Sequence, residues 1–183
     1  MNDAGRRLKA KTLVKSGRSP AVPPFAPGES VVYPGHGVGS VTSLEVQRVG
    51  GHELKLFVIL FAQDGMTLRV PVEKVKSSGL RRISTPRVME GALAKLKEPA
   101  VQSRTIWNRR ALEYAAKVNS GDPCLIAEVV RDLHSVGGER GPSHSQRLLY
   151  EQALGRLTQE LAAIEETHIE EATAKLEILL NAA

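Results

Sequence analysis

The stretch LKLFVILF, residues 54–61, is almost entirely apolar. A short apolar run with β-branched and aromatic residues is typical of a strand buried on both faces. Turn signals bound the run, with Gly50-Gly51 before it and Asp64-Gly65 after it. Both dipeptides favour tight hairpins, so the run is predicted to be a strand with hairpin partners on its two sides.

The flanking segments also have strand patterns. Residues 30–33 and 38–46 are rich in β-branched side chains, and residues 66–72 alternate between an apolar face and a second face. The apolar face holds Met66, Leu68, Val70 and Val72, and the second holds Thr67, Arg69 and Pro71. The connections are too short for helical crossovers, which makes the sheet antiparallel. These strands predict a small twisted barrel.

From residue 85 onward the apolar period becomes helical. Helix starts are predicted at Thr85-Pro86, at Thr105, at Asp122-Pro123, at Ser143 with Gln146, and at Thr167 with Glu170. The predicted fold class is α+β, with an antiparallel barrel over residues 28–84 and a compact all-helical domain over residues 85–183. Residues 1–27 carry six basic side chains, one acid and four prolines, which predicts a disordered arm.

The charges of the chain are segregated. Residues 81–120 hold nine basic and three acidic side chains, whereas residues 121–183 hold five basic and eleven acidic ones. Such asymmetry fits a surface that meets an anion, most plausibly nucleic acid. It fits equally well two halves of a fold that neutralise each other. Charge alone does not choose between these interpretations.

The sequence offers no support for an enzyme. Cys124 is the single cysteine, the five histidines lack metal-ligand spacing, and neither a nucleophile elbow nor a Walker loop is present. The glycines of GHGVG, residues 35–39, lie between two predicted strands, so no helix start is available to bind phosphate, and a tight turn with a bulge is expected. We therefore expect no cofactor and no metal. The single cysteine and the lack of a signal or membrane-spanning run favour the cytoplasm.

Two stretches remain as candidate binding sites. Pro71 marks residues 66–71 as an edge strand or a strand end. A partner protein could add a strand at this edge, with Arg69 giving specificity. The alternative is an ordinary hairpin whose edge is only protected from pairing by the proline. Residues 104–110 place the only tryptophan, Trp107, among three arginines, as in a minor-groove wedge. The alternative is that Trp107 is core, because it shares a helical stripe with Ala111, Tyr114, Ala115 and Val118.

Several motifs together resemble one known family. The N-terminal ones are VVYPGHGVG (residues 31–39), GMTLRVP (65–71) and residues 75–81; the C-terminal ones are WNRR (107–110), SGD (120–122) and IAEVVRDL (126–133). In this order and spacing they resemble the CarD/CdnL transcription regulators over about residues 28–180.

The resemblance implies a Tudor-like RNA polymerase-interacting domain, shared with the transcription-repair coupling factor, and a helical DNA-binding domain. It also implies docking on the β subunit of bacterial RNA polymerase and a tryptophan that stabilises the open complex at the upstream edge of the promoter bubble. Carried over by position, the polymerase-facing residues are Met66, Leu68, Arg69 and Pro71, and the DNA-binding ones are Trp107, Asn108, Arg109 and Arg110.

Two positions depart from the family pattern. Ala111 and Leu112 stand where relatives usually have an aromatic and then a basic residue, so Arg104, Lys117 or the arm would have to supply the missing phosphate contact. Gln47 stands where some relatives have an arginine that contacts polymerase, and Arg48 beside it is the expected substitute.

The prediction is a non-catalytic, monomeric transcription regulator that docks on polymerase and binds promoter DNA without sequence preference. Its main rival is a free-standing nucleic-acid-binding protein that uses the arm and residues 81–120. A third hypothesis is a hydrolase activity in the helical half, but that half lacks a plausible nucleophile–base pair.

Overall fold

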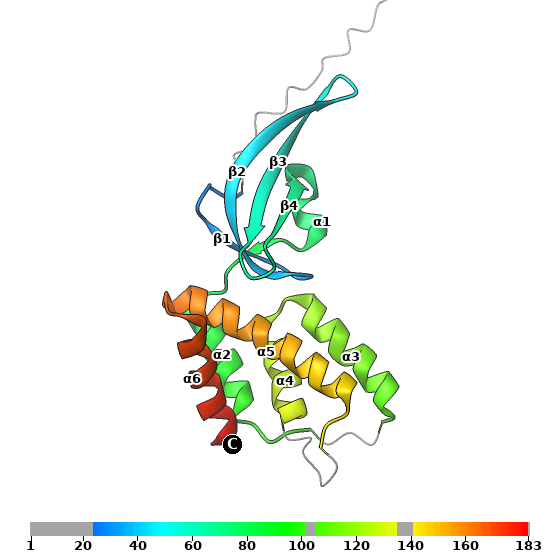
Figure 1. Ribbon diagram of the computed structural model, residues 1–183, viewed down its shortest axis with the longest axis vertical. Helices are drawn as coiled ribbons and strands as arrows, with labels where there is room; N and C mark the ends of the chain where they lie inside the picture. The colour runs from blue at the N-terminus through cyan, green and yellow to red at the C-terminus, as the bar shows by residue number, and fades with distance from the viewer. Residues whose placement is uncertain (1–23, 102–104, 135–140, 183) are drawn as a thin grey trace, which may run out of the picture.

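The computed structural model describes residues 24–101, 105–134 and 141–182. Figure 1 shows an antiparallel sheet stacked on a group of helices along the long axis of the molecule. This arrangement confirms the predicted α+β class, a Tudor-like antiparallel β-domain followed by an all-helical domain. The elements are β1 (Ser30–Tyr33), β2 (Gly37–Val49), β3 (His52–Phe61), β4 (Met66–Pro71), the 3₁₀ turn η1 (Val72–Lys74), α1 (Val75–Ser78), β5 (Arg81–Arg82), α2 (Pro86–Leu96), α3 (Trp107–Ser120), α4 (Pro123–His134), α5 (His144–Glu165) and α6 (Ile169–Asn181).

The sheet has the strand order β4-β3-β2-β1-β5, and every neighbouring pair is antiparallel. β3 lies between β2 and β4, and its residues 56–59 are buried on both faces, as predicted. Gly50 and Gly51 have φ values of 59° and 82°, the combination that a two-residue type I′ hairpin requires. Asp64 and Gly65 lie in the connection between β3 and β4. Both predicted hairpins are confirmed.

The core of the sheet includes a residue that the sequence placed in the arm. Phe25 is only 7% exposed, and its ring meets Phe57 edge-on with centroids 5.5 Å apart. The arm predicted over residues 1–27 therefore extends too far, because a buried aromatic side chain anchors its C-terminal end to the sheet; residues 1–23 lie outside the described part. The remaining buried members of this core are Val31, Val41, Ile59, Phe61, Val70, Val75 and Leu80.

The glycine-rich segment between β1 and β2 forms the expected turn, and Tyr33 pairs with Gly37 across it. The expected bulge is displaced, since the register shifts between Val41 and Ser43 rather than among the glycines. Gly39 has a packing role instead. A Cβ atom on Gly39 would lie 2.7 Å from Ile59 Cγ2 and 2.8 Å from Phe61 Cε1.

Three of the five predicted helix starts are confirmed. Thr85 Oγ1 accepts the amide of Val88, Asp122 Oδ1 accepts that of Cys124, and Ser143 forms a reciprocal capping box with Gln146.

The other two starts are wrong in detail. α3 begins at Trp107 with Ile106, rather than Thr105, at its N-cap position. Thr167 does not cap α6, whose N-cap residue is His168. The Thr167 amide instead donates to Ala162 O and closes the end of α5, which has Glu166 in a left-handed conformation.

A second core lies among the helices, and α4 is its centre. α4 packs against α2, α3 and α5, and buries both its apolar residues and the charged pair Arg131 and Asp132. α6 closes the core from the side of α2 and α5. The expected boundary between residues 84 and 85 falls in the short connection from β5 to α2.

We predict opposite effects for two glycine-to-alanine changes. Gly39→Ala forces a methyl group into Ile59 and Phe61 and should lower the free energy of unfolding by about 1–3 kcal/mol. Gly155→Ala lies inside α5 with no atom within 4 Å of the new Cβ and should raise it by about 0.5–1 kcal/mol. Urea unfolding followed by circular dichroism measures both changes, and equal midpoints for Gly39→Ala and wild type would contradict the packing argument.

Candidate functional site

The indole of Trp107 lies at the first residue of α3 and is half-buried. It packs against the helical core, as the periodicity allowed, yet it is not sealed beneath other side chains. Its Nε1–H donates to Ser145 Oγ, 3.0 Å away, in the first turn of α5. One side of the ring therefore belongs to the core and part of the ring remains accessible, while the wedge stays a prediction.

Arg110 lies against this ring rather than out in solvent. Its guanidinium carbon is 5.9 Å from the centre of the Trp107 ring and 5.5 Å from that of Tyr114. Its Nη2 donates to Tyr114 Oη at 3.4 Å, while its Nε is buried without a hydrogen-bond partner among the described residues. Cation–π contact of this kind holds both partners in place. Arg110 thus orients the indole, and less of its charge faces outward.

The other predicted DNA-binding residues differ in how much of their charge is available. Asn108 and Arg109 are exposed on the outer face of α3, and Arg109 makes only a long ion pair of 3.6 Å with Glu113. Lys117 lies about three turns further along, roughly 15 Å from Trp107, and is paired with Glu128 at 2.7 Å. Arg104 lies outside the described residues. The structure thus brings Trp107, Asn108, Arg109 and Arg110 together and leaves Lys117 apart.

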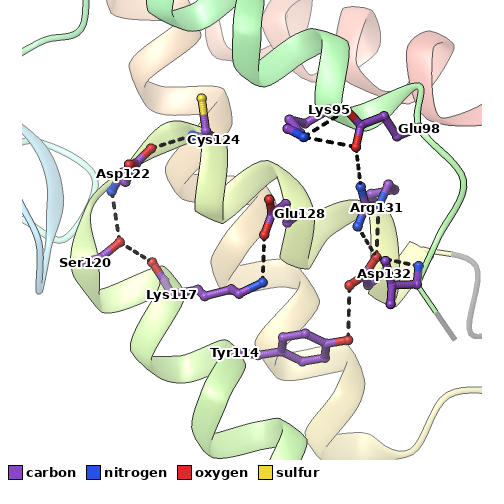
Figure 2. A network of polar contacts seen from close by, with 11 residues as sticks. Lys95, Glu98, Tyr114, Lys117, Ser120, Asp122, Cys124, Glu128, Arg131 and Asp132 are labelled. Atoms are coloured by element: carbon purple, nitrogen blue, oxygen red, sulfur yellow. Dashed lines mark hydrogen bonds and ion pairs between the residues drawn. The ribbon is translucent and has the colours of Figure 1, made fainter. Parts of the chain in front are cut away.

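A buried polar network begins at Tyr114, whose ring centre is 6.5 Å from that of Trp107, and continues into α4 (Figure 2). Tyr114 Oη donates to Asp132 Oδ2 at 3.3 Å. Asp132 Oδ1 accepts two hydrogen bonds from Arg131, at 2.9 and 2.7 Å, and one from the Val101 amide at 3.0 Å. Arg131 and Asp132 are only 7% and 6% exposed. The network therefore joins α3, through Tyr114, to a charged pair inside the protein.

The same network continues toward α2. Arg131 Nη1 donates to Glu98 Oε2 at 3.1 Å, and Lys95 donates to Glu98 at 2.9 Å. That contact with Glu98 raises the pKa of Lys95. Sequence reasoning assigned no individual role to Ser145, Arg131 or Asp132, because their contacts with Trp107, Glu98 and Tyr114 join distant parts of the chain and carry no local signal.

The predicted polymerase-docking residues gather on one strand. β4 is an edge strand of the sheet, as Pro71 suggested. Met66 and Leu68 are half-buried against the sheet core, whereas Arg69 points outward and pairs with Glu45 at 3.3 Å. An exposed ion pair of this kind is worth little in water, so Arg69 is available to a partner.

Arg48 lies outside this strand. It is on the β2–β3 ribbon that extends past the end of β4 (Figure 1), and it pairs with Glu53 at 3.1 Å. Pro71 pairs with Leu56, so Arg48 is roughly 10 Å further along the ribbon than the last residue of β4. The two arginines therefore belong to neighbouring but separate parts of the sheet.

Three further features of the described residues concern thiol reactivity, metal binding and membrane-spanning helices. Burial, with a smaller contribution from Asp122, raises the pKa of the Cys124 thiol, so the thiol is protonated at neutral pH and a weak nucleophile. No group of three histidine, cysteine or acidic side chains suited to a metal ion occurs within the described ranges. In the same part of the chain, no helix combines the length and apolar composition needed to cross a membrane.

Comparison with known proteins identifies both halves of the chain. Residues 25–84 match the family model of the CarD-like/TRCF RID domain, and residues 91–177 match that of the CarD C-terminal domain. The chain belongs to the CarD/CdnL family. Members of this family are transcription regulators, and the RID domain is its RNA polymerase-interacting part.

The chain is also similar to individual known proteins. "Putative transcription factor YdeB" of Bacillus subtilis is 26% identical over 140 residues, which is 76% of this chain and 92% of that protein. The solution structure of the 72-residue N-terminal domain of Myxococcus xanthus CarD is 36% identical and covers 32% of this chain and 77% of that one, with a TM-score of 0.28.

Two substitutions in the buried network should differ in cost. Asp132→Asn removes the charge that neutralises buried Arg131 and should lower the free energy of unfolding by about 3 kcal/mol. Tyr114→Phe removes one neutral hydroxyl and should cost about 1 kcal/mol. Urea unfolding followed through the fluorescence of Trp107, the sole tryptophan, reports both. Equal costs would show that the charge of Asp132 is unimportant.

Proposed function

We propose that this CarD/CdnL member docks on the β subunit of RNA polymerase through the β4 edge and stabilises the open promoter complex with Trp107. In this proposal residues 28–84 form the docking domain and residues 85–183 the DNA-binding domain, and the chain acts in the cytoplasm as a monomer. The observation that carries the proposal is the indole of Trp107, which is half-buried, oriented by Ser145 and Arg110, and bordered by exposed Arg109.

A ring held in this way is suited to act as a wedge. Unstacking one base step costs on the order of a few kcal/mol, and an apolar side chain that fills the opened step offsets part of that cost. A side chain already fixed by its neighbours loses little conformational entropy on binding. Ser145 and Arg110 therefore favour the wedge by restricting the ring before DNA arrives.

The charges available around the ring imply weak DNA binding by the isolated chain. Among the described residues beside Trp107, Arg109 is an exposed cation and Asn108 an exposed neutral side chain, whereas Lys117 is paired and Arg110 lies against the ring. One or two phosphate contacts give a salt slope of roughly −1 to −2. Docking on polymerase compensates for this weakness, because it raises the effective concentration of DNA near the helical domain.

The ion pairs of the basic block argue against the free-standing nucleic-acid binder. Arg81, Arg82, Lys95 and Lys117 all pair with carboxylates, at distances from 2.5 to 2.9 Å. With four of the block's nine cations paired in this way, its surface attracts phosphate more weakly than its sequence charge implies. Deleting residues 1–23 distinguishes the two functions: the rival protein would lose most of its DNA affinity, whereas the proposed regulator keeps its polymerase-dependent activity.

Trp107→Ala should shorten the lifetime of the open complex about tenfold or more, since a loss of 1.4 kcal/mol is already tenfold. Binding to polymerase should be unchanged. The measurement is the decay of competitor-resistant promoter complexes formed with the cognate polymerase. Ile178→Ala, a change at an exposed apolar residue on α6, is the control and should behave as wild type. Equal lifetimes for Trp107→Ala and wild type would remove the wedge from the proposal.

Arg69→Glu should abolish capture of polymerase in a pull-down assay, because it reverses the charge on the outward side of the β4 edge and places it beside Glu45. Lys55→Glu is the control: it makes the same charge change on the opposite face of the sheet. Circular dichroism checks that both variants fold. Undiminished capture by Arg69→Glu would mean that another surface docks.

A further inference from the structure

The sheet and the helical core are joined by one side of α5. Arg156 donates through both terminal nitrogens to the backbone carbonyls of Pro34 and Gly35, in the turn between β1 and β2. The Arg156 guanidinium is half-buried, and burial lowers its pKa. Two carbonyl oxygens thus replace part of the water that this group has lost.

Gln159, one turn further along α5, contacts the sheet at two more places. Its Oε1 accepts the amide of Val38 at 3.2 Å, and its Nε2 donates to Gln63 in the connection between β3 and β4. A Cβ atom on Gly37 would collide with the amide group of Gln159. The glycine-rich turn is therefore a surface that receives α5, which its sequence did not reveal.

Glu160 is the third residue of α5 that contacts the sheet domain, and it is the most buried of the three. Its side chain is 3% exposed and accepts Arg81 Nη1 at 2.7 Å, Arg81 Nη2 at 2.9 Å and the Ser84 amide at 2.9 Å. Arg81 belongs to β5 and also donates to the carbonyl of Gly121, at the end of α3. A bidentate pair that also satisfies its remaining acceptors has a well-defined geometry.

We propose that Arg156, Gln159 and Glu160 form an interdomain clasp that sets the angle and spacing between the β4 edge and Trp107. The clasp touches the β1–β2 turn, the β3–β4 connection and β5, and three separate points define an orientation, whereas the single covalent crossing from β5 to α2 leaves a pivot. Linked domains without such contacts move relative to each other by default.

α5 is also the helix that holds the indole. Its first turn supplies Ser145 to Trp107, and its later turns supply the clasp, so one continuous helix spans roughly 16–22 Å from the ring to the sheet. A rigid element in contact with both sites can transmit their relative position. The clasp residues are positioning residues for the proposed function, on which this inference rests: polymerase would hold the sheet, and α5 would place the ring.

The test uses the full chain with the double variant Arg156→Gln, Gln159→Ala. This variant leaves the buried Glu160–Arg81 pair intact, so both domains should fold. The control is Arg147→Gln, Gln152→Ala, the same changes at exposed positions of the same helix. Residual dipolar couplings measure the orientation of the two domains, and decay of promoter complexes measures the function.

For wild type and the control, one alignment tensor should fit both domains. For the clasp variant, two different tensors should be needed, and the lifetime of the open complex should fall at least threefold with polymerase capture and Trp107 fluorescence unchanged. Arg156→Lys with Gln159 retained should recover part of the lifetime, because lysine can donate to one of the two carbonyls.

Two results would overturn the clasp: a single tensor for the double variant, or two tensors with an unchanged lifetime. Failure of the proposed function gives a different pattern. Equal lifetimes for wild type and Trp107→Ala would reject the wedge, and with it the task assigned to the clasp, while the tensors would still report whether α5 sets the orientation of the domains.

Discussion

The carboxylate of Glu160 imposes the strictest constraint on this structure. A charge removed from water is tolerated only where donors surround it, and here Arg81 and the Ser84 amide supply them. The hydrogen bonds to Glu160 therefore hold α5 against β5. Arg81 also donates to the carbonyl of Gly121, which adds the end of α3 to the same set of contacts. Separation of α5 from β5 would leave this charge without partners. The buried pair therefore contributes specificity of arrangement more than net stability.

The pairing of charges explains the segregation seen along the chain. Arg81 and Lys117, from the basic block, pair with Glu160 and Glu128 from the acidic third, and Glu98 receives Arg131 in the opposite sense. Of the two interpretations that charge alone left open, mutual neutralisation accounts for Arg81 and Lys117, two of the nine basic residues of the block. Among the described residues, the positive charge left around Trp107 covers a small area, which agrees with the proposal that polymerase brings the helical domain to DNA.

Local sequence patterns predicted the strands and helices well, but they did not predict the contacts between these elements. Apolar periodicity, the Gly50-Gly51 turn and the capping box at Ser143 depend on neighbouring residues, so strands, hairpins and most helix starts were predictable. The Trp107 stripe predicted which side of α3 faces the core, but a stripe cannot show how far a ring at the end of a helix is covered. The hydrogen bond from Trp107 to Ser145, the Asp132 network and the Glu160 pair join residues far apart in the chain and leave no trace in sequence spacing.

The contacts of Arg156 end on backbone carbonyls rather than on side chains. The turn is thus recognised through its backbone, and the hydrogen bonds from Arg156 do not depend on which side chains stand at residues 34 and 35. Gly37, in contrast, has φ +84° and no room for a methyl group, so it is confined to glycine. During evolution the other side chains of the turn can therefore change while its backbone path is kept. Two distant homologues could share these interdomain contacts with few identical residues in the turn.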